Sequence, residues 1–136
     1  MLTCTKTLTW CSAHRLLGHE GACARLHGHN YRADITYASD LDNVGRVIDF
    51  SEIKDRVGKW IDDNWDHRVL LHVEDPLATT LRRVLPSEEV YVLSFNPTAE
   101  NMALVLSGVA RSQGPQVVRV RVWETDSGCA EWSSIK

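Results

Sequence analysis

Apolar and polar residues alternate along two stretches near the N-terminus. In residues 8–16, one face of an extended chain would carry Leu8, Trp10, Ser12, His14 and Leu16. In residues 27–37, one face would carry His27, His29, Tyr31, Ala33, Ile35 and Tyr37. A period of two residues is typical of a β-strand with one buried face. We therefore expect two strands, joined by a glycine-containing loop at residues 18–25.

The pattern changes to helical spacing in the middle of the chain. After a turn at residues 39–45, we expect residues 46–50 to return as a short extended segment. Asp49 and Glu52 have the spacing of a capping box, and apolar residues then recur three or four positions apart. This predicts an amphipathic helix over residues 51–65. We expect the sequence WDHRVLLH to end this helix in a loop, and residues 77–85 to form a short helical turn.

The C-terminal part of the chain combines strands with a second helix. Residues 90–95 predict a strand, and Thr98 is placed to cap a helix after it. Residues 116–125 predict the clearest strand, with Val118, Val120, Val122 and Glu124 on one face, and a short strand at residues 129–132 should pair with it. The order of elements predicts an α+β sandwich, with antiparallel hairpins and two helices on one face of the sheet.

Composition indicates a single domain over residues 1–136. Hydrophobic residues make up 43% of the chain and charged residues 24%, as in ordinary globular proteins. A net charge of -3 gives no electrostatic basis for binding nucleic acid. The apolar runs fall short of the roughly 18 residues that a membrane helix needs, and the first residues do not resemble a signal peptide. The four cysteines lack C-x-x-C spacing, so we expect reduced thiols in a cytoplasmic protein.

Three histidines are spaced as metal ligands would be on two paired strands. His27 and His29 project from the same face of a strand about 7 Å apart, and antiparallel pairing can bring His14 opposite them. Three imidazoles without an obvious fourth protein ligand are typical of a catalytic zinc ion with an open position. The alternative is that all three are hydrogen-bonded histidines of the core or of loops.

Four further residues have the chemistry of a catalytic site. Cys23 lies in the loop before His27, where the neighbouring Arg25 would favour a thiolate, although a buried cysteine can also be a small apolar residue. Asp66 and His67 can form an orienting pair for proton transfer, or His67 can simply interact with the end of a helix. Glu124 lies on the valine face of its strand, where an unpaired charge is costly, so it needs a donor partner unless a bulge near Thr125 turns it outward.

The chain resembles the 6-pyruvoyl-tetrahydropterin synthase/6-carboxy-tetrahydropterin synthase family. The resemblance is carried by the sequences AHRL, C-x3-HGH, IDFSEIK, DH, NPTAEN and ET…GC, which occur in that order between about residue 8 and residue 131. It implies a tunnelling fold, with a four-stranded antiparallel sheet and two helices packed on one face. It also implies that sheets of several subunits join into a barrel, as a homo-hexamer built from two trimers, with active sites at the subunit interfaces.

The same resemblance implies the roles of the candidate residues. His14, His27 and His29 would bind Zn²⁺, Cys23 would be the catalytic thiol, and Asp66 and His67 would supply a proton relay. Glu124 would be catalytic too, anchoring the 2-amino and N3 edge of a pterin, and Thr98 would lie near the pterin. The substrate would be the small molecule 7,8-dihydroneopterin triphosphate.

The spacing between Cys23 and His27 bears on the product. Three residues separate the thiol from the HGH sequence, as in 6-carboxy-tetrahydropterin synthases of the 7-deazaguanine (queuosine) pathway, which release acetaldehyde and triphosphate. Two alternatives stay open at this point: a pyruvoyl-forming synthase that releases triphosphate only, and a non-catalytic module that binds zinc or a pterin. The sequence DHRVLLH and the stretch at residues 72–96 depart from the usual family pattern, which leaves the substrate's tail less defined.

Overall fold

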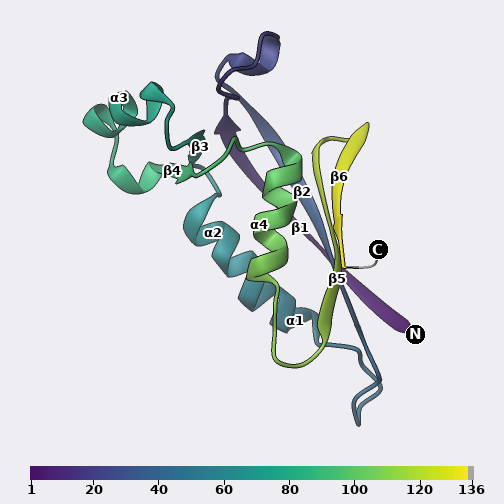
Figure 1. Ribbon diagram of the computed structural model, residues 1–136. Coiled ribbons are helices and arrows are strands. Elements are labelled where there is room, and N and C mark those ends of the chain that lie inside the picture. Colours follow the sequence, from purple (N-terminus) through teal and green to yellow (C-terminus); the bar gives the residue numbers. More distant parts are fainter. Residues whose placement is uncertain (135–136) are drawn as a thin grey trace.

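A mixed six-stranded sheet forms the framework of the protein. The computed structural model describes residues 1–134, and the order of strands across the sheet is β4-β3-β1-β2-β5-β6 (Figure 1). The strands are β1 (Leu2–His14), β2 (His27–Ser39), β3 (Val69–His72), β4 (Val90–Leu93), β5 (Gln116–Thr125) and β6 (Gly128–Ser133). Four of them, β1, β2, β5 and β6, are neighbours in the sheet and pair antiparallel. The family resemblance implies a sheet of four antiparallel strands; the observed sheet has six, because β3 and β4 add two strands that pair parallel.

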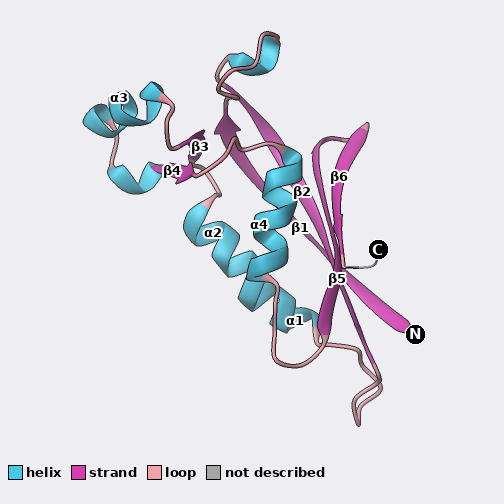
Figure 2. Cartoon of the chain, in the orientation of Figure 1, coloured by secondary structure: helices cyan, strands magenta, loops and turns pink. Residues whose placement is uncertain are grey.

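The helices lie mainly on one face of this sheet (Figure 2). One helical segment runs from residue 50 to residue 64 as α1 (Phe50–Ile53), a π-helical turn η2 (Lys54–Gly58) and α2 (Lys59–Asn64). The second helix against the sheet is α4 (Ala99–Val109), and α3 (Pro76–Val84) packs beside β3 and β4. Two short 3-10 turns, η1 (Ala22–Ala24) and η3 (Ser87–Glu89), complete the fold. The predicted helix at 51–65 and the predicted helical turn at 77–85 are both confirmed.

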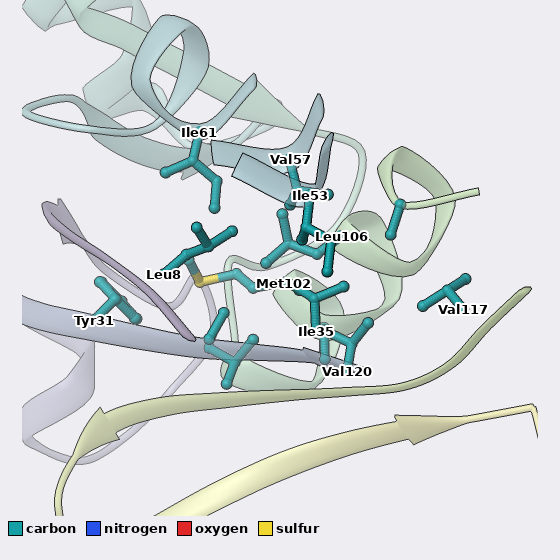
Figure 3. Packing of buried hydrophobic residues seen from close by; sticks show 14 of the residues in the cluster. Leu8, Tyr31, Ile35, Ile53, Val57, Ile61, Met102, Leu106, Val117 and Val120 are labelled. Atoms are coloured by element: carbon teal, nitrogen blue, oxygen red, sulfur yellow. The ribbon is translucent and has the colours of Figure 1, made fainter. Parts of the chain in front are cut away.

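The core lies between the sheet and the two main helices, as the alternation of apolar residues predicts. Figure 3 shows Met102 and Leu106 of α4 meeting the apolar side of residues 50–64 above the sheet. From the sheet, Leu8 and Trp10 of β1 are buried together with Tyr31, Ala33, Ile35 and Tyr37 of β2. The opposite face of β1 carries Thr3, Thr5, Thr7 and Thr9, all exposed. Helices therefore cover one face of these central strands, and threonines line the other.

Three local predictions are wrong, each for a physical reason. The sequence WDHRVLLH was expected to be a loop, but Val69–His72 form β3, parallel to β1 and to β4. Leu70 and Leu71 are both fully buried, on opposite sides of the strand, so no alternation of polar and apolar residues is visible there. Residues 46–50 form no strand, because Asp49 already caps α1 through a hydrogen bond from the backbone N–H of Ser51.

The third correction concerns the buried face of β5. The sequence places Val118, Val120 and Val122 together, yet Val117 is buried with Val120 and Val122, whereas Val118 is partly exposed. The pairing of β5 with β2 shifts between Thr36 and Tyr37. Such a bulge places an extra residue in one strand, so the alternation changes face at that point.

Among residues 1–134, none of the helices combines the length and the apolar character that crossing a membrane requires.

Candidate metal centre and active site

The hairpin of β1 and β2 positions the three candidate ligands. In its register, His14 lies opposite His27, Ala13 opposite Gly28 and Ser12 opposite His29. A Cβ atom at Gly28 would lie 3.2 Å from the carbonyl oxygen of Ser12, so glycine permits this close approach of the two backbones. The ligand atoms of His14, His27 and His29 all lie within 4.8 Å of one another, as their spacing in the sequence predicts.

Two backbone carbonyls set the tautomers of His14 and His27. The Nδ1 atom of His14 lies 2.7 Å from the carbonyl oxygen of Pro97, and that of His27 lies 2.6 Å from the carbonyl oxygen of Arg25. A carbonyl can only accept a hydrogen bond, so each Nδ1 carries the proton and each Nε2 presents a lone pair. The two Nε2 atoms are 3.1 Å apart, which is unfavourable unless a cation lies between them.

His29 completes a donor set that fits a metal ion. Its Nε2 atom is buried and has no hydrogen-bond partner among the residues that the structure describes. Burial lowers the pKa of both His14 and His29 below the ordinary value, against smaller opposing effects that include the carboxylate of Glu124. Both imidazoles are therefore favoured as neutral ligands. Three converging imidazole nitrogens are a donor set suited to zinc.

A cavity of about 400 Å³ opens beside these histidines. Cys23, Thr98 and Glu124 line it together with His14. The carboxylate oxygens of Glu124 lie 3.9 Å from Nε2 of His14 and 3.7 Å from Nε2 of His29. The pairing of β5 with β6 is irregular between Trp123 and Thr125, but Glu124 still faces the histidines. The cavity thus unites a candidate metal centre, a thiol and a carboxylate, in a size range typical of small-molecule sites.

The NPTAEN sequence connects this cavity to the rest of the fold. The side-chain amide of Asn96 exchanges two hydrogen bonds with the backbone of Leu17, at 2.8 and 2.9 Å. Pro97 provides the carbonyl that orients His14. Thr98 caps α4 by accepting a hydrogen bond from the backbone N–H of Asn101 at 3.1 Å, as predicted, and also lines the cavity. Each of the three residues thereby helps to place the wall of the site.

Asp66 and His67 form a pair, but on the other side of the sheet. The Oδ1 atom of Asp66 lies 2.9 Å from Nδ1 of His67, whose side chain is 78% exposed. His67 contacts Cys11. Successive residues of a strand point to opposite faces, so Cys11, three positions before His14 in β1, faces the other side of the sheet. The two residues do not line the cavity of Cys23 and Glu124. Within one chain, the structure therefore separates the candidate relay from the candidate thiol.

Sequence reasoning missed two features of the site. Cys11 was not a candidate, yet its thiol lies beside His67. The available signal was its position on the face of the strand opposite to that of His14. Arg15 binds the buried carboxylate of Asp75, with 2.7 Å between Nε and Oδ2. The sequence offers no pattern that links these two residues across 60 positions.

Comparisons with known proteins agree with this geometry. The sequence model of the 6-pyruvoyl tetrahydropterin synthase family matches residues 3–134. A protein of Rickettsia bellii named 6-carboxy-5,6,7,8-tetrahydropterin synthase is 37% identical over 131 residues, covering 92% of this chain and 95% of its own. A Haemophilus influenzae protein of the same name is 30% identical over 141 residues, covering 97% of this chain and 99% of its own.

Solved structures show the same fold at lower identity. An uncharacterized protein from Wolinella succinogenes superposes with a TM-score of 0.86 at 24% identity, covering 98% of both chains. The 6-pyruvoyl tetrahydropterin synthase of Caenorhabditis elegans gives a TM-score of 0.70 at 20% identity, covering 98% of this chain and 95% of that one. With a family match over nearly its whole length, this chain belongs to the 6-pyruvoyl tetrahydropterin synthase family.

Proposed function

We propose that this chain is a zinc-dependent lyase of the 6-carboxy-5,6,7,8-tetrahydropterin synthase type. It would convert 7,8-dihydroneopterin triphosphate to 6-carboxy-5,6,7,8-tetrahydropterin, with release of acetaldehyde and triphosphate, in 7-deazaguanine biosynthesis. The observation that carries the proposal is the convergence of three imidazole nitrogens beside a cavity that Cys23 and Glu124 also line. The names of the relatives, which are 30% and 37% identical over nearly the whole chain, favour this product over the pyruvoyl product.

The residues of the cavity divide the chemistry among them. Zn²⁺ held by His14, His27 and His29 would supply a Lewis acid for the hydroxyl groups of the substrate's side chain. Cys23, as a thiolate, would remove the proton from the side-chain carbon next to the ring. Glu124 would accept hydrogen bonds from the 2-amino and N3 groups of the pterin and so hold the ring in register, with Thr98 nearby.

Asp66 and His67 would act as the proton relay of a neighbouring subunit's site. Two observations support an assembly of this kind. First, Asp66 and His67 lie outside the cavity of their own chain. Second, two edges of the sheet are free among the described residues: the outer side of β1 along Leu2–Trp10 pairs with no other strand, and β6 is the last strand of the sheet. Pairing of β1 in one subunit with β6 in the next would close a barrel and satisfy both edges. We include a homo-hexamer of two trimers and a cytoplasmic location in the proposal.

A product assay tests the reaction. Zinc-loaded protein is incubated with 7,8-dihydroneopterin triphosphate, and acetaldehyde is measured together with the pterin product. Equal amounts of acetaldehyde and 6-carboxy-tetrahydropterin are expected. A pyruvoyl product without acetaldehyde would overturn the assignment and indicate a 6-pyruvoyl-tetrahydropterin synthase. Absence of turnover would also overturn it and indicate a non-catalytic module that binds zinc or a pterin.

Single variants test the role of the thiol. Cys23→Ala should retain zinc and lose turnover, because the thiol acts on the substrate and not on the metal. Cys4→Ser is the matched control, since Cys4 lies at the N-terminal end of β1, the end opposite to His14, where its thiol contacts the carbonyl oxygen of Ile48. Loss of zinc from Cys23→Ala, with zinc retained in Cys4→Ser, would show that Cys23 is a ligand.

Subunit mixing tests whether one site uses two chains. Cys23→Ala and His67→Ala proteins, each inactive alone, are unfolded together, refolded and assayed. If thiol and relay come from different chains, random mixing restores both groups in about a quarter of the sites, and activity returns to that level. If each site uses one chain, the mixture stays inactive and the interface assignment is wrong.

A further inference from the structure

A second group of metal-binding side chains lies on the sheet face opposite the histidine centre. The Sγ atom of Cys11 lies 3.6 Å from Nε2 and 3.7 Å from Nδ1 of His67, and 3.9 Å from Oδ1 of Asp66. Among residues 1–134, this group and the three histidines are the two sets of side chains whose ligand atoms converge closely enough to hold a metal ion.

The distances from the sulfur of Cys11 to one donor atom of each partner are near those of tetrahedral coordination. Zinc binds thiolate sulfur at about 2.3 Å and imidazole nitrogen at about 2.0–2.1 Å, which places the two donors about 3.5 Å apart. The distances from Cys11 to His67 and Asp66, 3.6 and 3.9 Å, are therefore close to those of a bound state. Because Sγ lies almost equally far from both ring nitrogens, neither nitrogen lone pair points toward it, and the His67 ring must turn before all three groups can coordinate one ion. The ring has room to turn, since the side chain is 78% exposed.

The backbone holds the three donors in place before any ion binds. The backbone N–H of Cys11 donates to Oδ1 of Asp66 at 3.2 Å, and the backbone N–H of His67 donates to the carbonyl oxygen of Cys11 at 2.7 Å. Arg68 secures the same turn by donating to the carbonyl oxygen of Asp66 at 2.8 Å. His67 has φ of 59°, a backbone conformation that few residues other than glycine adopt. The turn that presents its ring is thus anchored to β1 on both sides.

We propose that Cys11, Asp66 and His67 form a second, separate site for a thiophilic divalent cation such as Zn²⁺, Co²⁺ or Cd²⁺. Binding converts the Cys11 thiol to a thiolate and releases its proton. The site then offers one sulfur, one nitrogen and one oxygen ligand, and leaves a fourth position for water or another ligand. The choice of a thiophilic ion follows from the sulfur ligand, which hard cations such as Mg²⁺ do not favour.

The consequence of this site rests on the proposed function. Asp66 and His67 are the residues assigned to the proton relay, and they cannot bind a metal and transfer protons at the same time. Excess metal at this site would therefore inhibit an enzyme whose histidine centre is already filled. The existence of the site itself does not depend on the reaction and is measured without substrate.

Cobalt titration of the metal-free protein tests the site. Co²⁺ reports both stoichiometry and ligand type, because a thiolate ligand adds a sulfur-to-metal charge-transfer band in the near ultraviolet. We expect two equivalents per chain in wild type, with the sulfur band accompanying one of them. Cys11→Ser should bind one equivalent and lose the band, and Cys4→Ser should keep both.

Two further variants identify which side chains hold the second ion. His67→Ala changes a side chain that is 78% exposed, so it tests the same site with little risk to folding, and it should also lose one equivalent. Cys23→Ser should keep the band. The proposal is overturned if wild type binds a single equivalent, or if the sulfur band disappears in Cys23→Ser and persists in Cys11→Ser.

Discussion

Replacing Gly28 by alanine should weaken metal binding without unfolding the protein. Gly28 lies between the two ligands of β2 and opposite Ala13, one residue from the ligand of β1. A new Cβ atom would lie 3.2 Å from the carbonyl oxygen of Ser12, so this backbone atom would have to move away by a few tenths of an ångström. Such a shift moves β2 away from β1 at the point where their histidines must share one ion.

The size of the effect follows from comparing this shift with the tolerance of a metal centre. Metal–ligand distances are held to about ±0.2 Å, so a displacement of a few tenths exceeds what the ligands absorb freely. Changes in groups that orient ligands reduce metal affinity by about tenfold to a hundredfold, or about 1.4–2.8 kcal/mol. In the metal-free protein, overpacking at this position should lower the free energy of unfolding by about 1–3 kcal/mol. Replacing glycine by alanine also lowers the entropy of the unfolded chain, which raises the free energy of unfolding by about 0.4–1 kcal/mol. The net loss of stability should therefore stay below about 2.6 kcal/mol.

Two measurements separate these contributions. Zinc affinity is determined by competition with a chromophoric chelator, and the free energy of unfolding is determined by urea denaturation in excess chelator. Gly108→Ala is the matched control: Gly108 is an exposed residue of α4 with no atom within 4 Å of a new Cβ, so affinity should not change and stability should rise by about 1 kcal/mol. Unchanged zinc affinity in Gly28→Ala would refute the argument that this close approach positions the ligands.

Three other predictions concern stability and inhibition. The guanidinium of Arg15 holds the pKa of buried Asp75 below the ordinary value of 3.8. The ionised carboxylate of Asp75 therefore stabilises the fold at neutral pH, and this stabilisation is lost as the pH falls through the lowered pKa. Asp75→Asn should thus lower the free energy of unfolding by about 2 kcal/mol at pH 7 in urea titrations, with a gap that narrows below pH 3.8; a constant gap would contradict the ion pair. Leu106→Ala empties a fully buried position and should cost about 2–5 kcal/mol in the same titration, with one equivalent of zinc still bound to the histidines; a cost below about 1 kcal/mol would contradict its place in the core. Zinc beyond one equivalent should inhibit turnover, and Cys11→Ser, unlike Cys4→Ser, should move the inhibition in a dose–response assay to at least about tenfold higher zinc; equal inhibition of both variants would place the effect elsewhere.

Much of the fold could be predicted because its main strands have one apolar and one polar face. The alternation in β1 and β2 identified Leu8, Trp10, Tyr31 and Ile35 as core residues, and the structure buries all four. The same reasoning failed for β3, whose leucines are buried on both sides, and at the bulge between Thr36 and Tyr37. In both places the pattern depends on contacts with strands far away in the sequence.

The candidate metal centre could likewise be predicted from the spacing of residues along the chain. His27 and His29 lie two residues apart in one strand, and a hairpin brings His14 to them, so the sequence contains most of the required geometry. The tautomer of His14 could not be predicted, because it depends on the carbonyl of Pro97, which lies 83 residues away along the chain.

The order of residues along the chain thus determined the main strands, the helix caps and the histidine cluster, because each of these forms between residues that are close together in the sequence. Long-range packing decided the rest: Glu124 turned toward the histidines, Arg15 paired with Asp75, and His67 placed beside Cys11 on the far face. These contacts join segments 56 or more positions apart, where sequence spacing carries no information about direction. Which side of the sheet each reactive group faces is a property of the packed sheet, and it separates the thiol of Cys23 from the pair of Asp66 and His67.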